Sequence, residues 1–296
     1  MKKFLILIPI YNDWKSVFKL LDKIELAIAI WDAEVSVLII NDASIENRPE
    51  IKQKYNNIKL VRVMNMKKNQ GHARCHATGL KFIMEKEQFD HVILMDGDGE
   101  DRPEELSLLF EQGKKYPDKI VTADRVKRSE GIFFKLLYEC HKILTYIFTG
   151  KYIKFGNFSC LPRQFVMRIV KEKSLWSSYS GTVAKVVFER VSIPSERGKR
   201  YFGPSQMNFF KLLLHSFSIM AVFRENVIIR SAIFIFFYLF FISNNFSIIT
   251  LFPVVAVTIF LFLILNIATR ENLKELEDAL KNIENVEILS SFDGRQ

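Results

Sequence analysis

The stretch that decides the fold is His91-Val-Ile-Leu-Met-Asp-Gly-Asp-Gly-Glu-Asp-Arg-Pro-Glu-Glu-Leu106. It begins with a short apolar run, residues 92–95, which is typical of a buried strand. Four carboxylates follow the run within six residues: Asp96, Asp98, Glu100 and Asp101. Glycines 97 and 99 stand between them and let the backbone bend sharply. Pro103 and two glutamates then mark the start of a helix.

This arrangement favours a bound cation. Carboxylates crowded at the carboxyl end of a strand repel one another unless a positive charge lies among them. Oxygen ligands with open positions suit Mg²⁺ or Mn²⁺, which bind phosphates and protein together. An Asp-x-Asp pair by itself is often only a solvated acidic turn. The strand before it and the helix start after it favour a metal site here.

Composition restricts the kinds of partner. The 296-residue chain has a formal net charge of +9, which favours phosphorylated ligands, an acidic membrane surface or nucleic acid. The basic residues are scattered and form no nucleic-acid-binding signature, so we expect no nucleic acid partner. Three cysteines, at positions 75, 140 and 160, have no metal-like spacing and favour a reducing compartment.

Strands and helices alternate in the first half of the chain. Apolar runs predict strands at 4–8, 35–40, 58–63, 92–95 and 120–123. This order predicts a parallel sheet with helices on both faces, which binds its ligand at the carboxyl ends of the strands. Acidic residues stand at these ends: Asp13, Asp42, Asp96 and Asp98. We therefore expect the site at this edge of the sheet.

A long apolar block follows. No charged residue occurs between Ser231 and Thr269, which is close to the length of two membrane spans. We predict spans at 226–242 and 246–268 with a turn at Asn244-Asn245. Arginine and lysine flank the block while the turn has none, so the positive-inside rule places both termini in the cytoplasm. The expected location is the inner (cytoplasmic) membrane, with two spans and a cytoplasmic main domain.

The segments around this block are also predicted. Residues 208–225 form an amphipathic pattern, which is either a core helix or a helix lying in the membrane interface. Residues 270–296 are expected to be a cytoplasmic tail that forms a charged surface helix. Residues 1–207 are then the cytoplasmic domain that carries the acidic motifs.

Together these motifs resemble the family 2 glycosyltransferases, which have a GT-A fold. The chain is most similar to their dolichyl- and polyprenyl-phosphate branch, over roughly residues 3–222. The resemblance implies an α/β fold: a GT-A-type nucleotide-binding sheet flanked by helices, followed here by a two-helix transmembrane hairpin. It also implies that residues 1–207 are the glycosyltransferase domain.

On the donor side, the resemblance implies binding of a UDP- or GDP-linked sugar. The implied donor-binding residues are Pro9, Tyr11, Asp13, Asp42, Gly71 and Asp96. Asp13 stands where the family usually has Glu, and Gly71 belongs to the Asn-x-Gly loop. The implied Mg²⁺ or Mn²⁺ ligands are Asp98, Glu100 and Asp96, with Glu100 in place of a frequent Gln.

On the acceptor side, the resemblance implies that Arg125 faces the acceptor phosphate. Arg200, Gly203 and Ser205 match an Arg-x-x-Gly-x-Ser motif that closes over the diphosphate and the lipid phosphate. Asp98, Arg125 and Arg200 are thereby the implied catalytic residues. Two departures concern this side: Gln206-Met207 replaces a lysine and tyrosine, and Asn157 replaces an acid.

The predicted function is membrane-anchored, inverting transfer of a hexose to polyprenyl (dolichyl or undecaprenyl) phosphate. A lipid monophosphate is largely dianionic at pH 7 and needs no base, whereas a sugar hydroxyl does. We find no carboxylate-base motif between the metal site and the end of the domain, which favours the phosphate. Transfer to a hydroxyl of a lipid-linked or surface glycan is the alternative, with Glu189 or Glu196 as the base.

Other interpretations stay open. A nucleotide-sugar-binding or scaffolding membrane protein with a decayed site would carry the same motifs without turnover. His72 and His76 are four residues apart on a predicted helix, but no third ligand follows in sequence, so we expect them to be structural. The sugar, the nucleotide and the oligomeric state, a homo-oligomer included, are not determined by the sequence.

Overall fold

The computed structural model describes residues 1–50, 54–127, 132–187, 189–204 and 209–292. Its centre is one eight-stranded sheet in the order β7-β5-β6-β4-β1-β2-β3-β8. The strands are β1 (Lys2–Ile10), β2 (Ala33–Asn41), β3 (Ile58–Met66), β4 (His91–Leu94), β5 (Ile120–Lys127), β6 (Phe155–Pro162), β7 (Arg190–Glu196) and β8 (Ile283–Ser291). The five strands that the sequence predicts are all present.

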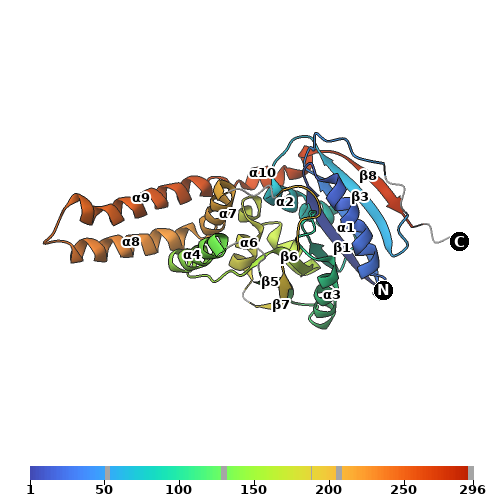
Figure 1. Cartoon of the computed structure of the whole chain (residues 1–296). Helices are drawn as coiled ribbons and strands as arrows, with labels where there is room; N and C mark the ends of the chain where they lie inside the picture. Colours follow the sequence, from blue (N-terminus) through green and yellow to red (C-terminus); the bar gives the residue numbers. More distant parts are fainter. Residues whose placement is uncertain (51–53, 128–131, 188, 205–208, 293–296) are drawn as a thin grey trace.

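Helices connect these strands and extend beyond them (Figure 1). The α-helices are α1 (Trp14–Ala27), α2 (His72–Lys86), α3 (Leu106–Lys115), α4 (Ile132–Thr149), α5 (Arg163–Ile169), α6 (Tyr179–Val186), α7 (Phe209–Ala221), α8 (Arg224–Phe241), α9 (Ile248–Ala268) and α10 (Leu273–Glu277). Three short 3₁₀ helices are η1 (Pro103–Glu105), η2 (Lys173–Trp176) and η3 (Ala279–Asn282).

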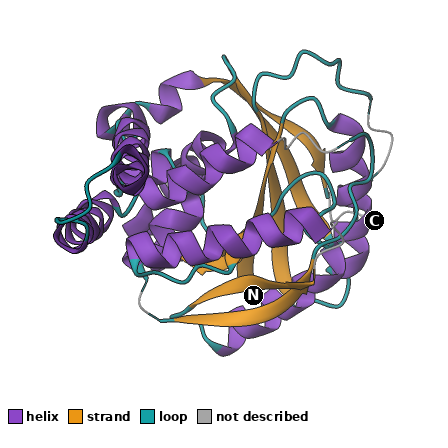
Figure 2. Cartoon of the chain, turned by 60° about the vertical axis from the view of Figure 1, so that its left-hand side comes forward, coloured by secondary structure: helices purple, strands orange, loops and turns teal. Residues whose placement is uncertain are grey.

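Helices cover both faces of the sheet, as expected (Figure 2). Successive residues of a strand point to opposite faces, and in β1 both faces are apolar. Phe4, Ile6 and Ile8 pack in one core with residues of α1 and α3. Leu5 and Leu7 pack in a second core with residues of α2, α5 and α6. This double burial explains why β1 is an unbroken apolar run rather than an alternating one.

The sheet is mixed, not parallel as the alternating pattern predicted. Strands β4, β1, β2 and β3 are parallel neighbours, and β5 is parallel to β7. Strand β6 is antiparallel to both β4 and β5, and β8 is antiparallel to β3. The two antiparallel strands, β6 and β8, lie outside the five strands on which the parallel prediction was based. The carboxyl ends of β1, β2, β4 and β5 still meet at one edge.

The C-terminal segment differs from the predicted surface helix. Between residues 271 and 292, which the structure describes, only α10 and η3 are helical. Strand β8 completes the sheet by pairing with β3, so that Val63 lies opposite Glu287. The side chain of Arg48 forms two hydrogen bonds to Glu287, at 2.7 and 3.1 Å. The charges in this segment suggested a solvated helix, but as an edge strand it has the charged residues that such a position favours.

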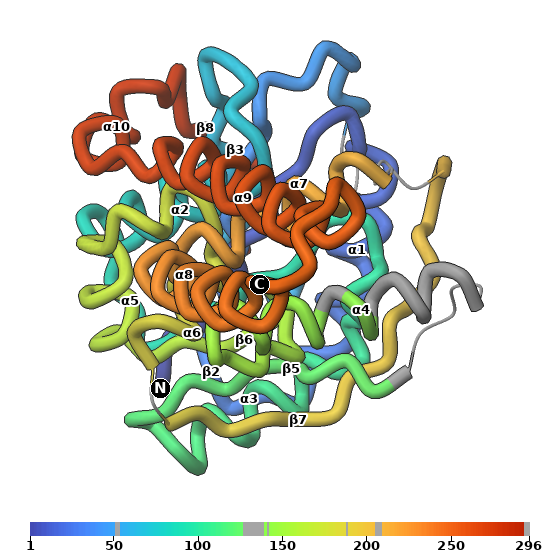
Figure 3. Tube along the Cα trace, turned by 90° about the vertical axis from the view of Figure 1, so that its left-hand side faces the viewer, coloured from blue at the N-terminus to red at the C-terminus, as the bar shows by residue number. Residues whose placement is uncertain are grey.

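Helices α8 and α9 project together away from the sheet, and α4 and α7 lie at their base (Figures 1 and 3). Within the described residues, one helical segment, Ile248–Glu277, is long and apolar enough to cross a membrane, and it includes α9. Helix α8 has 18 residues but contains Arg224, Glu225 and Arg230. The predicted pair of helices is present, while its composition supports a span for α9 alone.

Helix α7 corresponds to the amphipathic segment predicted at 208–225. Its last turn is buried, with Met220 and Ala221 in a small core that includes Ile264 of α9. Its first residues, Phe209 and Phe210, are exposed. The helix therefore joins the base of the hairpin to the main domain at one end and presents aromatic side chains at the other.

Candidate active site

The acidic residues predicted at the strand ends do lie at one edge of the sheet. The backbone N–H of Asp42 donates to Ile10 O at 2.9 Å, which ties the end of β2 to the end of β1. The turn after β1 is held by Ser44, whose hydroxyl accepts from Asn12 N at 2.8 Å. Asn12 and Ala43 both have positive φ, at 51° and 55°. Such a conformation in non-glycine residues is uncommon and marks two tight, well-determined turns.

The glycines of the acidic stretch have different steric roles. A Cβ on Gly97 would lie 2.7 Å from Ile10 Cγ2, so only glycine lets the end of β4 lie so close to β1. Gly99 has φ +89°, and a Cβ there would lie 2.5 Å from the ring of Tyr201. Glycine is thus required at Gly99 both by the backbone and by the packing of the segment that follows β7.

Arg200 connects two of the predicted acidic residues. Its Nη1 donates to Asp98 Oδ2 at 3.0 Å, and its Nη2 pairs with Asp13 Oδ2. Arg197 pairs in the same way with Glu100. Burial, followed by the charges of Asp96 and Glu100, raises the pKa of Asp98 to about 6. Burial and mutual repulsion disfavour the ionised form of these carboxylates, and the two arginines therefore supply the positive charge that stabilises it.

Asp101 is a buried member of this cluster. Its Oδ2 accepts from Asp96 N at 2.9 Å, and its Oδ1 lies 3.9 Å from Arg125 Nη2. Burial and then the charge of Asp96 raise the pKa of Asp101 to about 8. Arg125 in turn lies against Gly156, where a Cβ would be 3.3 Å from Nη2. Arg125 is thus held next to the acidic residues, on the side where β5 ends and β6 begins.

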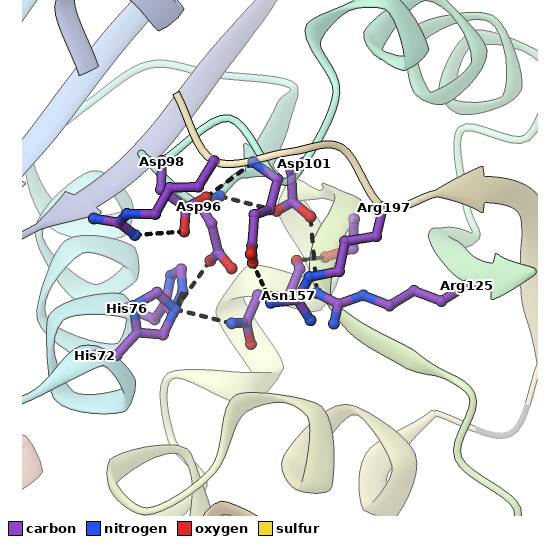
Figure 4. A network of polar contacts seen from close by, with 11 residues as sticks. His72, His76, Asp96, Asp98, Asp101, Arg125, Asn157 and Arg197 are labelled. Carbon is purple, nitrogen blue, oxygen red and sulfur yellow. Dashed lines mark hydrogen bonds and ion pairs between the residues drawn. The ribbon is translucent and has the colours of Figure 1, made fainter. Parts of the chain in front are cut away.

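Two histidines complete the cluster, and the sequence did not predict them there. His72 Nε2 lies 3.1 Å from Asp96 Oδ1 and 2.9 Å from both His76 Nε2 and Asn157 Nδ2. Figure 4 shows these side chains pointing toward one another. Although burial opposes both shifts, the pairing raises the pKa of His72 and lowers that of Asp96. The third member of this group, Asp96, is distant from the two histidines in sequence and comes from the end of β4.

The remaining predicted donor-side residues have varied surroundings. Pro9 is buried in β1, while Tyr11 is half exposed at the same edge. Both carboxylate oxygens of Asp42 accept backbone N–H groups, from Gln70 and Gly71, each at 2.8 Å. Asp42 thereby fixes the loop that leads into α2.

The acceptor-side residues are described only in part. Gly203 has φ +67° in the segment after β7. Ser205, with Gln206 and Met207, lies outside the described residues, so its predicted role stays a prediction. Arg200, in the same motif, lies at the acidic edge as described above.

The carboxylates fit a divalent cation by their chemistry. Asp98 and Glu100 are ionisable oxygen donors at the mouth of the cluster, and their neutralising partners are guanidinium groups on one neighbouring segment. A bound ion would replace the arginines as the counter-charge. Within the described residues, the group of three whose ligand atoms lie within 4.8 Å of one another is a different one: His72, His76 and Asp96.

Comparisons with known proteins identify the family of the chain. A model of the family described as "Glycosyl transferase family 2" matches residues 5–177. The chain is 26% identical over 219 residues to undecaprenyl-phosphate 4-deoxy-4-formamido-L-arabinose transferase of Klebsiella pneumoniae (strain 342). That match covers 72% of this chain and 64% of the relative, so it spans less than two thirds of the relative's length.

Two solved structures share the fold. Glucosyl-3-phosphoglycerate synthase from Mycobacterium tuberculosis, in complex with Mn²⁺, uridine diphosphate and glucosyl-3-phosphoglycerate, is 10% identical with a TM-score of 0.50. The similarity covers 76% of this chain and 80% of that chain. Mannosyl-3-phosphoglycerate synthase from Rubrobacter xylanophilus is 12% identical with a TM-score of 0.50, over 75% of this chain and 72% of that chain. The sheet and its helices are therefore of the GT-A type.

Proposed function

Because the chain belongs to glycosyl transferase family 2, we propose that it transfers a hexose from a UDP- or GDP-linked sugar to polyprenyl phosphate. The transfer is a direct displacement: the acceptor phosphate oxygen bonds to the anomeric carbon as the nucleotide diphosphate leaves, and the configuration inverts. The observation that carries the proposal is the convergence of Asp13, Asp98 and Arg200 at the carboxyl edge of the sheet. In such sheets this edge binds the ligand.

Binding of the donor uses the carboxylates and a divalent cation. Asp98, Glu100 and Asp96 would hold Mg²⁺ or Mn²⁺, which supplies positive charge to the leaving diphosphate. Tyr11 and Asp13, at the end of β1, are placed for the nucleoside. The relative structure with Mn²⁺ and uridine diphosphate supports use of a divalent ion in this fold.

Arg197 and Arg200 are the protein's own source of positive charge for the leaving diphosphate. Arg200 and Arg197 lie beside the carboxylates that would hold the cation, and Arg200 is also paired with Asp13, so both guanidinium groups would stay within the site. Fixed cations next to developing phosphate charge lower the barrier without reorganisation. Arg125, held beside Asp101 at the end of β5, is placed for the acceptor phosphate.

Of the two candidate bases, Glu196 ends β7 at the acidic edge, where Arg102 lies 3.6 Å from its carboxylate. Glu189 is exposed, pairs with Lys119 at 2.9 Å and precedes β7, so it lies at the opposite edge of the sheet. The carboxylate of Asp101 is buried, accepts from Asp96 N and lies beside Arg125, so it is already engaged by the protein. A dianionic lipid phosphate needs no general base to attack the sugar. The curated relative's name, an undecaprenyl-phosphate transferase, supports the same class of acceptor.

Membrane attachment through α8 and α9 supports a lipid acceptor. Large apolar side chains are exposed along both helices, among them Phe236, Phe240, Phe252 and Phe262. Strand β8 follows α9 and pairs with β3 of the main domain, so the chain returns to the side from which it left. A single crossing is incompatible with that pairing, whereas two crossings agree with it. We therefore propose a two-span hairpin with the catalytic domain in the cytoplasm.

Arg230 is compatible with a span because it lies near the beginning of α8. Its Nη1 donates to Ile147 O at 3.0 Å, in the last turn of α4. The carbonyl end of a helix stabilises a cation, so this arginine is satisfied at the base of the hairpin. Its charge therefore does not have to reach the centre of the bilayer.

The test is transfer of labelled hexose to undecaprenyl phosphate by the full-length protein in detergent, with UDP- and GDP-sugars and Mn²⁺ or Mg²⁺. We expect a glycosyl-phosphate lipid, and loss of it in Asp98→Asn. The matched control is Asp32→Asn, the same change at an exposed aspartate before β2, at the opposite edge.

Two outcomes would overturn the proposal. Label appearing only on a glycan hydroxyl, with activity lost in Glu196→Gln, would establish the alternative acceptor, because Glu196 ends β7 at the acidic edge. Asp98→Asn transferring sugar as well as wild type would show that this cluster is not the catalytic site.

A further inference from the structure

The cluster formed by His72, His76 and Asp96 holds more than an ion pair. Gly71, with φ +89°, leads into α2, and Asp42 fixes the loop before it through two backbone hydrogen bonds. The first turn of α2 is therefore firmly placed. Residues four apart lie on one face of a helix, so both imidazoles point to the end of β4, where Asp96 lies (Figure 4).

Hydrogen bonding alone does not satisfy this arrangement. His72 Nε2 is within 3.1 Å of three polar atoms, on His76, Asn157 and Asp96. An imidazole nitrogen offers either one proton or one lone pair. A lone pair on His72 would face the Asp96 carboxylate, and a proton would face the Asn157 amide group. If the Asn157 amide is turned so that its oxygen faces His72, a single proton on His72 Nε2 would face three acceptors, on Asn157, His76 and Asp96.

Two further atoms of the cluster lack hydrogen-bond partners. His76 is fully buried, and its Nδ1 has no hydrogen-bond partner within the described residues. The Oδ1 atom of Asp96 also accepts no hydrogen bond there, although His72 is near it. Buried polar groups are usually paired, so an unpaired Asp96 Oδ1 next to the imidazole nitrogen of His72, which itself lies next to that of His76, favours a missing ligand. The ligand must accept lone pairs from two nitrogens and one oxygen.

A metal ion meets this requirement. The ligand atoms of His72, His76 and Asp96 all lie within 4.8 Å of one another. Two of their separations, 2.9 and 3.1 Å, match the edge of an octahedron with bonds of about 2.1 Å, which is about 3 Å. Since His72 is about half exposed, solvent or a phosphate oxygen can reach the remaining positions.

We propose that His72, His76 and Asp96 form a binding site for a first-row transition-metal ion such as Mn²⁺, Co²⁺ or Zn²⁺. Two imidazoles and one carboxylate suit these ions, whereas Mg²⁺ prefers oxygen ligands and water. The two histidines distinguish this site from the one proposed at Asp98 and Glu100, and Asp96 is shared between the two. An ion here adds a second positive charge beside the donor diphosphate.

The test uses Co²⁺ as the probe, with untagged full-length protein in detergent that a chelator has stripped of metal. We expect one equivalent of Co²⁺ to bind with a visible absorption band characteristic of nitrogen ligation. His72→Ala should weaken binding by at least tenfold and remove the band. His215→Ala, at an exposed histidine of α7, is the matched control and should keep both.

Asp98→Asn separates this site from the proposed activity. It should abolish sugar transfer and retain the Co²⁺ band. The buried His76 is replaced by leucine to limit loss of packing, and a melting curve establishes that each variant is folded. If wild type and folded His72→Ala bind Co²⁺ equally and show the same spectrum, the cluster is only a hydrogen-bonded histidine pair, and the metal site is refuted.

Discussion

Among single residues, Arg200 has the largest expected effect on activity, because it contacts carboxylates that come from two strand ends. We expect Arg200→Ala to lower kcat/KM by about 10²–10³-fold, a magnitude typical of losing one preorganised charge at a leaving group. Arg200→Lys should recover little, because an ammonium group cannot contact both carboxylates in a fixed fork. Steady-state kinetics with varied nucleotide sugar measure this.

Removal of this guanidinium should also change metal binding. Asp98 loses a competing cation in Arg200→Ala, so Mn²⁺ should bind more tightly even as transfer slows. Arg168→Ala, at an exposed arginine of α5, is the control for a general loss of positive charge. Unchanged kinetics in Arg200→Ala would mean that the arginine only holds the carboxylates apart from substrate.

A pair of glycines isolates the effect of packing from that of backbone strain. Gly71 and Gly99 both have φ +89°, but a Cβ on Gly71 has nothing within 4 Å, whereas one on Gly99 meets Tyr201. Gly71→Ala should therefore cost about 1 kcal/mol, and Gly99→Ala about 1–3 kcal/mol more. Melting temperatures of the two variants, measured together, test the difference. Equal losses would mean that the ring of Tyr201 moves aside freely.

The buried His91 introduces a pH dependence of stability. It stacks on Phe4 with ring centroids 4.8 Å apart, and neither ring nitrogen has a hydrogen-bond partner in the described part of the chain. Burial, and then the charge of Lys2, lowers the pKa of His91 to about 4. The unfolded chain, with a histidine pKa near 6.5, binds this proton first as the pH falls. Stability is therefore full above about pH 6.5 and is lost between 6.5 and 4.

This loss is about 2 kcal/mol by pH 5 for one such histidine. We expect His91→Leu to melt near the wild-type temperature at pH 7.5 and to lose less stability between pH 7 and 5. His215→Leu, at an exposed position, should follow the wild-type curve. If His91→Leu loses as much on acidification as wild type, another group, such as the buried His76, dominates.

The residues that sequence reasoning found and missed differ in a physical way. The positions of Asp13, Asp42 and Asp98 were predictable because each lies within three residues of the end of an apolar strand run, and parallel strands bring such ends together. His72 and His76 were assigned as structural because the third ligand, Asp96, is close only in space. Arg200 was predicted through the resemblance, whereas Arg197 was not, because it lies after β7, a strand without a strong apolar signal.

Among the elements, β8 links the C-terminal segment to the edge of the sheet formed by β2 and β3. Asn65 of β3 donates to Asn285 and Glu287 of β8, at 2.8 and 2.7 Å, and accepts from Asn41 of β2 at 2.9 Å. The pattern of charges along this segment could not have predicted the pairing, because an edge strand and a solvated helix are both polar outside. What distinguishes them is the long-range partner β3.

We expect truncation after Asn282 to lower the melting temperature strongly or to cause aggregation, because it exposes the edge of β3. Truncation after Phe292 removes only residues that follow β8 and should leave the melting curve unchanged. Both forms keep α8 and α9, so differences in detergent binding cancel. A normal melting curve for the shorter form would show that β8 is dispensable for the fold.

For the whole molecule, the pairing of β8 with β3 requires both ends of the apolar hairpin to be on one side of a membrane. The proposed topology therefore places Asn245, in the turn between α8 and α9, on the outer face. Cys140 is exposed while Cys75 and Cys160 are buried, so Cys140→Ser gives a background without accessible thiols. In this background, Asn245→Cys should react with an impermeant maleimide in intact cells.

The matched position is Asp32→Cys in the same background, which should react only after the membrane is opened, because it lies on the catalytic domain. The comparison distinguishes the three arrangements that the apolar surface of α8 and α9 allows. Two crossings give labelling at 245 alone. A hairpin lying in the inner interface protects both positions, and an external catalytic domain exposes position 32. Since polyprenyl phosphate and nucleotide sugars meet at the cytoplasmic face in the proposed reaction, labelling at 32 in intact cells would refute the acceptor as well as the topology.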